Sequence, residues 1–369
     1  MPLSKIQDIG NQVIPNLGRR NLIINGAMQV AQRGTVTSAA GKYGGADRYQ
    51  FAAAGGANST LSQDTDVPTG NGFSSSQKVD VTTAGNMSGS GHYAMIRQKI
   101  EGQNLQHLLY GTSSAKKLTL QFWVKSPKTG THIVELYHGD VNYFNSRQYT
   151  IASANTWQKV TLTFDGYQTT ALNNDNGIGI QLAWWLAASA TYNSGTHSDN
   201  TWHNDATKRA VGQVNVFDDT ANNFYLTGVQ LEVGDTASDF EHRSFAEELS
   251  LCQRYFQQFA GETGVGSAYT GIAVGHRSSG TRTFFFKQLS VEMRTPPTLT
   301  LSGTTGMRVA NMVSDASATS SLAFGNREMG TVCGYFRLDH NSIGGSTGDG
   351  CRLDRNNNTN AGIEADGEL

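Results

Sequence analysis

The sequence has few cysteines and no long apolar run. Its cysteines, Cys252, Cys333 and Cys351, are odd in number and show no C-x-x-C spacing, so neither a disulfide framework nor a zinc site is indicated. This usage predicts reduced thiols in a protein made in a cytoplasm. No apolar stretch approaches the roughly 18 residues of a membrane-spanning helix, and the first residues lack the charged and then apolar pattern of a signal peptide.

An excess of charge of one sign is also missing. The chain carries 28 Lys and Arg against 30 Asp and Glu, a formal net charge of −2. Binding to nucleic acid or to an anionic membrane requires clustered positive charge. The sequence therefore predicts no nucleic-acid partner and no membrane partner.

Catalytic signatures are absent as well. No P-loop, H-E-x-x-H or dinucleotide-binding pattern occurs in the sequence. Residues 344–348 match G-x-S-x-G, but that motif needs a strand before it and a helix after it, and its flanks here are typical of loops. We therefore expect no catalytic residues and no enzyme.

The sequence is rich in turn-forming residues and in segments where apolar and polar residues alternate. Glycine accounts for 42 of the 369 residues, which is typical of short strands joined by many turns. Apolar and polar residues alternate with a period of two through residues 118–125, 157–164 and 178–186. Because this leaves one polar face on each strand, the pattern favours antiparallel sheets and an all-β sandwich.

Residues 224–259 join two regions of strand-like sequence. The apolar parity flips at Gly228, which predicts a β-bulge. Ser244 and Glu247 form a capping box, and we expect a linking helix over residues 244–260. Its apolar residues recur at helical spacing and could form a seam between copies of the chain, or could pack the helix onto its own domain. These residues are Phe245, Leu249, Cys252, Phe256 and Phe259. Residues 261–369 are predicted to form a second, smaller β domain.

Four blocks, at residues 21–35, 46–51, 118–126 and 224–259, resemble in order and spacing a family of bacteriophage virion proteins. The resemblance implies a jelly-roll β-sandwich over residues 21–243, similar to that of carbohydrate-binding modules. An extended N-terminal arm at residues 1–20 precedes it.

The resemblance also implies a role. We expect a virion structural protein, made in the host bacterial cytoplasm, that serves as a tail fibre or similar appendage and helps recognise host surface polysaccharide. A capsid decoration, cement or head-fibre protein is the alternative, and a glycan hydrolase is a third possibility. A homotrimer is implied, with contacts to other virion proteins through the N-terminal arm.

The segment that follows the 178–186 strand is rich in aromatic residues beside Asn, Asp and His. Trp185, Tyr192 and Trp202 offer ring faces on which the C–H groups of a sugar can stack, with polar side chains nearby for its hydroxyls. Trp184 shares the inward parity of its strand, so Trp185 is expected to face outward or against a neighbour. The alternative is that these rings pack against the end of the sandwich or a subunit contact.

A structural calcium ion is the one cofactor considered. Jelly rolls of the kind that the sequence resembles often carry calcium, and Asp47 and Glu232 lie in the matching blocks. The oxygen-rich residues 173–177 are a further candidate, because calcium prefers oxygen ligands. Asn-Asp-Gly clusters are also typical of plain turns, in which Asn and Asp bond their own backbone.

Overall fold

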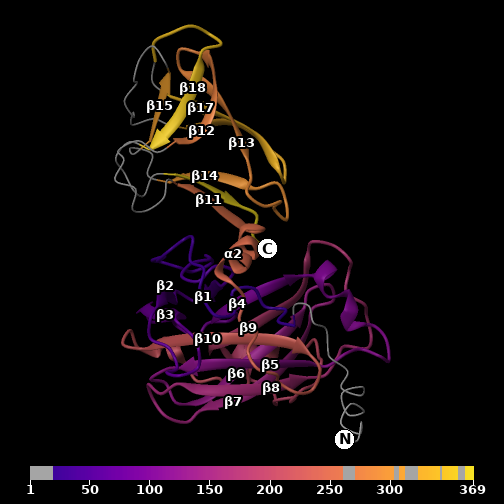
Figure 1. Ribbon diagram of the computed structural model, residues 1–369. Coiled ribbons are helices and arrows are strands. Elements are labelled where there is room, and N and C mark those ends of the chain that lie inside the picture. Colours follow the sequence, from indigo (N-terminus) through magenta and orange to yellow (C-terminus); the bar gives the residue numbers. More distant parts are fainter. Residues whose placement is uncertain (1–19, 261–270, 303–306, 312–322, 341–342, 356–361) are drawn as a thin grey trace, which may run out of the picture. The chain divides into compact units, whose positions relative to one another are not determined.

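The computed structural model describes residues 20–260, 271–302, 307–311, 323–340, 343–355 and 362–369. The chain divides into two compact units, Met1–Phe245 and Ala246–Leu369 (Figure 1). Of the predicted N-terminal arm, residues 1–19 lie outside the described residues. Within the described ranges, no helix has the length and apolar character needed to cross a membrane.

The first unit consists of two five-stranded antiparallel sheets. Sheet I has the order β1 (Gln50–Ala54), β4 (Tyr93–Glu101), β9 (Ile178–Ala188), β6 (Gly130–His138) and β7 (Tyr143–Ile151). Sheet II has the order β2 (Asn58–Asp64), β3 (Ser76–Thr83), β10 (Asn223–Val233), β5 (Leu118–Lys125) and β8 (Gln158–Phe164). The predicted all-β jelly-roll sandwich is therefore confirmed.

The core of this unit follows from the alternation in the sequence. The inward side chains of β5 have no exposed surface, and they are Leu118, Leu120, Phe122 and Val124. Phe122 meets Trp184 of β9 edge to face, with 5.6 Å between ring centres. Each fully buried apolar side chain contributes about 1.5–3 kcal/mol relative to an exposed one, so this central layer dominates the stability of the sandwich.

Strand β10 contains the predicted bulge. The register with β5 shifts between Thr227 and Gln230, and Gly228 has a φ of +61°. The inward residues change parity across it, from Leu226 to Val229, and both are buried. A glycine is needed because a Cβ at this position would lie 2.6 Å from the Phe73 ring.

Short helices lie in the connections of the jelly-roll unit. They are η1 (Gly102–Asn104), η2 (Gln106–Leu108), α1 (Ala190–Asn193), η3 (Ala206–Lys208) and η4 (Val216–Asp218). The last three belong to the connection from β9 to β10. Part of that connection packs on the outer face of sheet I, where Ala210 and Trp185 belong to one buried apolar cluster.

The second unit starts at Ala246, the second residue of α2 (Phe245–Gln253), and has two antiparallel sheets. The smaller sheet has the order β11 (Phe256–Ala260), β19 (Gly362–Asp366) and β14 (Thr298–Ser302). The larger has the order β15 (Met307–Asn311), β18 (Gly350–Arg355), β12 (Gly271–Ser279), β13 (Arg282–Gln288), β17 (Cys333–Asp339) and β16 (Ala323–Met329). The core of the second unit includes Phe285 and Phe336, whose rings stack with centres 5.6 Å apart.

The predicted helix over residues 244–260 is too long, and the seam prediction is wrong in that its five residues do not share one helix. Helix α2 ends at Gln253, and Phe256 and Phe259 lie in β11, which pairs with β19. The backbone N–H and C=O groups of residues 256–260 pair with those of β19, about 100 positions further along the chain (Phe256 opposite Asp366). Within α2, Phe245 is 57% exposed, Leu249 is half-buried and Cys252 is buried.

Candidate functional site

Trp185 does not face solvent. Its side chain is fully buried on the outer face of sheet I, in a cluster with Met95, Ile133 and Ala210. The predicted orientation, away from the main core and against a neighbour, is confirmed. As a sugar-stacking residue the prediction is wrong, because a ring without exposed surface cannot contact a ligand.

Tyr192 is half-buried and takes part in the same packing. Its ring centre lies 5.2 Å from that of Trp185 and 5.8 Å from that of Tyr93. The guanidinium of Arg209 lies 5.6 Å from the Tyr192 ring centre. The contacts of Tyr192 are those of a residue that holds the β9–β10 connection on the sheet.

Trp202 lies in an open cleft of about 500 Å³ at the edge of the sandwich. The lining residues, which we call the aromatic cleft, are Ala115, Lys117, Tyr143, Asp165, Gly166, Tyr167, Gln168, Thr169 and Trp202. They come from the approach to β5, the start of β7, the segment after β8 and the β9–β10 connection. The cleft therefore assembles residues that are far apart in the sequence.

Three rings form the apolar part of the cleft. Tyr167 is 5.1 Å from Tyr143 and 5.4 Å from Trp202 between ring centres, and both pairs are tilted. The indole N–H of Trp202 donates to the carbonyl of Asp165 at 2.7 Å. A bridge between Phe144 and His203 fixes the backbone beside Trp202. The indole is thus held in place while its ring remains part of the cleft wall.

The polar part of the cleft is an ion pair with neighbouring uncharged groups. Lys117 Nζ lies 3.0 Å from Asp165 Oδ1. The hydrogen bond and the charge of Asp165 raise the pKa of Lys117 above its usual value. Gln168 and Thr169 are exposed beside them. The cleft therefore combines flat apolar faces with donors and acceptors suited to hydroxyl groups.

The carboxylates of Asp47 and Glu232 are each used within the chain. Asp47 accepts from the Gln32 backbone N–H at 3.0 Å and from its side-chain amide at 2.6 Å, and burial raises the pKa of Asp47. Glu232 accepts from the hydroxyl of Ser238 at 2.6 Å and from its backbone N–H at 2.8 Å. Calcium ligation by this pair stays a prediction. Among the residues with described placement, no group of three or more His, Cys, Asp or Glu is arranged to hold a metal ion.

The oxygen-rich loop at residues 173–177 forms turn contacts. Asp175 Oδ1 accepts from the backbone N–H of Gly177 at 2.9 Å, and Asn173 donates from its side chain to Asp140 at 2.6 Å. The Asp175 bond is of the kind that plain Asx turns make, whereas the Asn173 bond joins the loop to the segment that follows β6.

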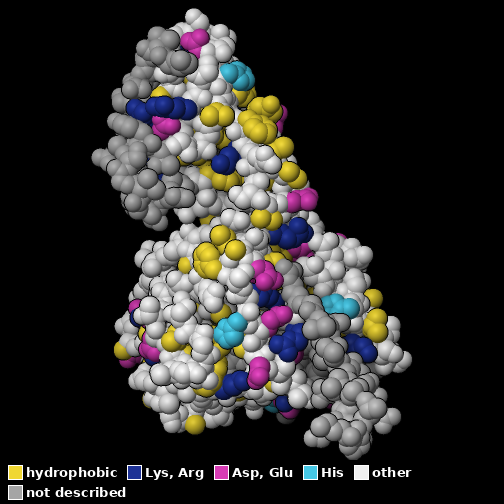
Figure 2. Space-filling view, viewed as in Figure 1, with side chains coloured by type: hydrophobic (Ala, Val, Ile, Leu, Met, Phe, Trp, Pro, Cys, Tyr) yellow, Lys and Arg dark blue, Asp and Glu magenta, His cyan; other side chains and the backbone are white. Residues whose placement is uncertain are grey.

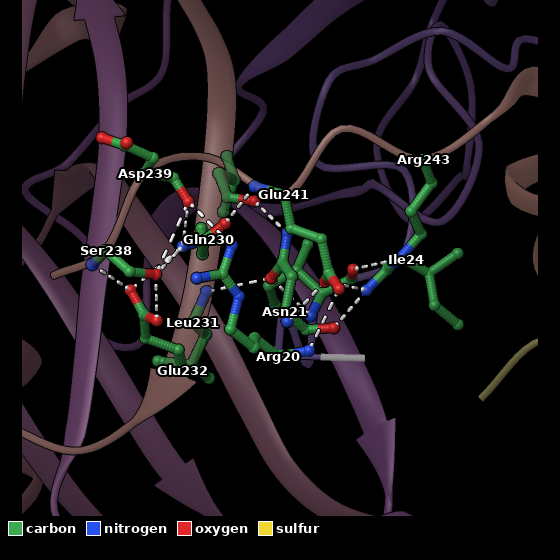
Figure 3. A network of polar contacts seen from close by, with 12 residues as sticks. Arg20, Asn21, Ile24, Gln230, Leu231, Glu232, Ser238, Asp239, Glu241 and Arg243 are labelled. Carbon is green, nitrogen blue, oxygen red and sulfur yellow. Dashed lines mark hydrogen bonds and ion pairs between the residues drawn. The ribbon is translucent and has the colours of Figure 1, made fainter. Parts of the chain in front are cut away.

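A polar network ties the start of the jelly-roll unit to its end (Figure 3). Arg243 donates to the carbonyls of Asn21 and Ile23. Glu241 accepts from the backbone N–H groups of Arg20 at 3.2 Å and Asn21 at 2.8 Å. Burial opposes ionisation of Glu241, but these N–H groups and the charge of Arg243 outweigh it and lower its pKa. We call this network the terminal clamp.

Charged side chains of both signs are mixed on the visible face of the jelly-roll unit (Figure 2). Lys and Arg there lie among Asp and Glu rather than in one basic area. The mixture matches the near-zero net charge of the sequence.

Sequence reasoning identified Trp202 but missed its neighbours in the aromatic cleft. These neighbours come from three separate segments, each beside a strand end: Lys117, Tyr143, and Asp165 with Tyr167. A polar residue or tyrosine beside a strand end is common in any β protein, so the sequence offered no local signal. The pairing of β5 with β8 brings Lys117 near Asp165. Tyr143 of sheet I meets Tyr167 only where the two sheets of the sandwich pack together.

No protein-family model matches the sequence, and no curated protein matches it. Solved structures with a similar arrangement include the enzymatically active domain of bacteriophage CBA120 tailspike protein 4, at 14% identity and a TM-score of 0.32. That match covers 58% of this chain and only 21% of the tailspike chain. A CBM4 structure matches at 15% identity and a TM-score of 0.29, over 57% of this chain and 97% of that one. TmCBM61 in complex with β-1,4-galactotriose matches at 8% identity and a TM-score of 0.29, over 58% of this chain and 99% of that one.

Proposed function

We propose that this chain is a structural protein of a bacteriophage virion, a tail fibre or similar appendage, and that its jelly-roll unit binds host surface glycans in the aromatic cleft. The virion role is supported by the sequence blocks described above. The observation that carries the binding role is the set of three adjacent rings, Tyr143, Tyr167 and Trp202, beside the Lys117–Asp165 ion pair.

The chemistry of the cleft suits a saccharide. The C–H face of a pyranose is apolar and packs on an aromatic ring, while its hydroxyls at the rim both donate and accept. Asp165 accepts, Lys117 donates, and Gln168 does both. Because the cleft is open, one site is expected to bind weakly. Several copies on one particle would raise the avidity without further contacts.

We propose binding rather than hydrolysis. Enzymes that cleave glycosidic bonds generally use two carboxyl groups, one on either side of the bond. Asp165 is the one acidic residue among those that line the aromatic cleft, and it is ion-paired with Lys117. The described lining of the cleft therefore lacks the second carboxyl group that such a reaction uses.

The test is the binding of the full-length chain to an array of bacterial capsular polysaccharides and lipopolysaccharides. We expect the wild type to bind at least one of them and Trp202→Ala to bind it at least tenfold more weakly. The matched control is Trp157→Ala, since Trp157 directly precedes the other end of β8. It lies roughly 25 Å along the strand from Asp165 at about 3.3 Å per residue.

Three results would contradict the proposal. They are no binding to any glycan, equal binding by the wild type and Trp202→Ala, and an equal loss in Trp157→Ala. The bound polysaccharide is also incubated with the protein and sized. We expect an unchanged chain-length distribution, and shortened chains would replace the binding role with a hydrolytic one.

A further inference from the structure

A partly buried arginine lies on the outer face of sheet I, away from the residues of the aromatic cleft. Arg97 is in register with Gln50 of β1 on one side and with Ala183 of β9 on the other. Its Nε–H donates to the side-chain carbonyl of Gln50 at 2.8 Å. Within the described part of the chain, this is the one hydrogen bond of its guanidinium, and no carboxylate pairs with it.

The acidic residue across β9 from Arg97 already forms an ion pair with another arginine. Glu135 of β6 faces the same Ala183 from the other side, but it accepts two hydrogen bonds from Arg209, at 2.9 and 2.7 Å. The carboxylate of Glu135 thus pairs with Arg209 and not with Arg97. Burial, and to a lesser degree the charge of Arg209, lower the pKa of Arg97, so the surroundings disfavour its charge and an incoming anion would relieve this.

Aromatic and basic residues surround Arg97. The phenol groups of Tyr43, Tyr93 and Tyr137 lie close enough to influence the pKa of Arg97. Lys99, two residues further along β4, shares its side of the sheet. The guanidinium of Arg33 lies 5.4 Å from the ring centre of Tyr43. A guanidinium with free terminal N–H groups matches a carboxylate in bidentate geometry, and a tyrosine hydroxyl can both donate to and accept from the rest of a ligand.

We infer that Arg97 is the centre of a second saccharide-binding site, which takes the carboxylate of an acidic sugar. The two terminal nitrogens of Arg97 would donate to the two carboxylate oxygens, with Gln50 holding the guanidinium through Nε. This site is separate from the aromatic cleft, and it can bind even where the cleft binds nothing. It would give an appendage with this fold a preference for polysaccharides that contain uronic acids.

The experiment measures binding of the full-length chain to polyglucuronic acid fragments by calorimetry, beside the same fragments with their carboxyl groups reduced to alcohols. We expect binding to the carboxylated form only, weakened by added salt because the contact is ionic. Arg97→Gln should weaken it at least tenfold. Arg97→Lys should fall between the two, since an ammonium keeps the charge but not the fork of donors.

Two controls separate this site from others. Arg282→Gln removes an arginine of the second unit whose side chain is 55% exposed, and it should bind as the wild type does. Trp202→Ala should also bind polyglucuronic acid unchanged, so failure of the cleft and failure of the Arg97 site are distinguishable. Glucuronate should compete for the site, and inorganic phosphate at the same concentration should not.

Several outcomes would overturn the inference. They are no binding of polyglucuronic acid by the wild type, equal binding of the reduced fragments, and unchanged binding by Arg97→Gln. Equal competition by phosphate would make the site one for any oxyanion rather than for a sugar. Should Arg97→Gln fail to fold, Arg97→Lys still tests the site, because affinity equal to the wild type would exclude bidentate recognition.

Discussion

Arg209 holds Glu135 by two hydrogen bonds on a sheet face where the Glu135 side chain has no exposed surface. Above the pair, the guanidinium lies 3.9 Å from the ring centre of Phe144 and 5.1 Å from that of Trp185. The ion pair therefore fixes the β9–β10 connection, which carries Arg209, onto sheet I. Through this contact a residue far along the chain helps to bury Trp185.

Removal of one partner of this pair should destabilise the jelly-roll unit strongly. We expect Glu135→Gln to lower its free energy of unfolding by about 3–5 kcal/mol, because the charge of Arg209 is left buried without a partner. Urea unfolding followed by tryptophan fluorescence measures the change. The double variant Glu135→Leu with Arg209→Met should lose much less, because no unpaired charge remains. An equal loss in both variants would contradict the role given to the ion pair.

The bulge in β10 should tolerate only glycine. A Cβ at Gly228 would lie 2.6 Å from Phe73 Cζ and 2.9 Å from Trp123 Cδ1, and the φ of +61° disfavours other residues. We expect Gly228→Ala to cost about 2–4 kcal/mol, from backbone strain and crowding together. Gly34 has the same φ with nothing within 4 Å of a Cβ, so Gly34→Ala should cost about 1 kcal/mol. Equal costs would show that crowding contributes nothing.

The terminal clamp should control how firmly residues 21–25 are held. Arg243→Met keeps most of the side-chain length but leaves the carbonyls of Asn21 and Ile23 without their donor. We expect a loss of about 1–3 kcal/mol. Faster hydrogen exchange should appear at the backbone N–H of Asn21, which donates to Glu241 in the clamp. Arg282→Met, an exposed arginine of the second unit, should leave this exchange unchanged. Exchange that is equally fast in both variants would contradict the clamp.

The alternation of apolar residues was enough to predict some of the strands and their inner faces. Residues 118–125 and 157–164 match β5 (Leu118–Lys125) and β8 (Gln158–Phe164), because side chains of period two can bury only one face of a sheet. The bulge at Gly228 was equally predictable, since a parity flip at a glycine has a local cause. These features depend on neighbours in the sequence.

Features that depend on distant segments could not be predicted. The spacing of Phe256 and Phe259 suits a helix, but pairing with β19 (Gly362–Asp366) places them in a strand. Trp185 looked available for ligands because the polar face of a strand is usually solvated, whereas Arg209 and Ala210 cover it. In the same way, Trp202 became part of a cleft only once Tyr143 and Tyr167 were placed beside it.

Acid should destabilise the jelly-roll unit through its buried histidines. His132 has no exposed surface, its Nε2 lies 3.0 Å from the Lys128 carbonyl, and its Nδ1 lies 3.4 Å from the Gln213 amide nitrogen. This arrangement suits the neutral ring. Burial lowers the pKa of His132 from 6.5 to about 4, and burial also lowers the pKa of His138 and of His203. His132 therefore binds a proton less readily in the folded state than in the unfolded chain.

The sign and the pH window follow from these values. Above pH 6.5 neither state holds the proton, so the stability is fully present there. Between pH 6.5 and about 4 the unfolded chain is protonated first, and His132 alone should lower the free energy of unfolding by about 3 kcal/mol across this range. Urea unfolding at a series of pH values measures the slope. His132→Gln should flatten it, whereas His276→Gln, an exposed residue of the second unit, should not. A slope that is unchanged in His132→Gln would place the acid sensitivity elsewhere, with His138 and His203 as the next residues to replace.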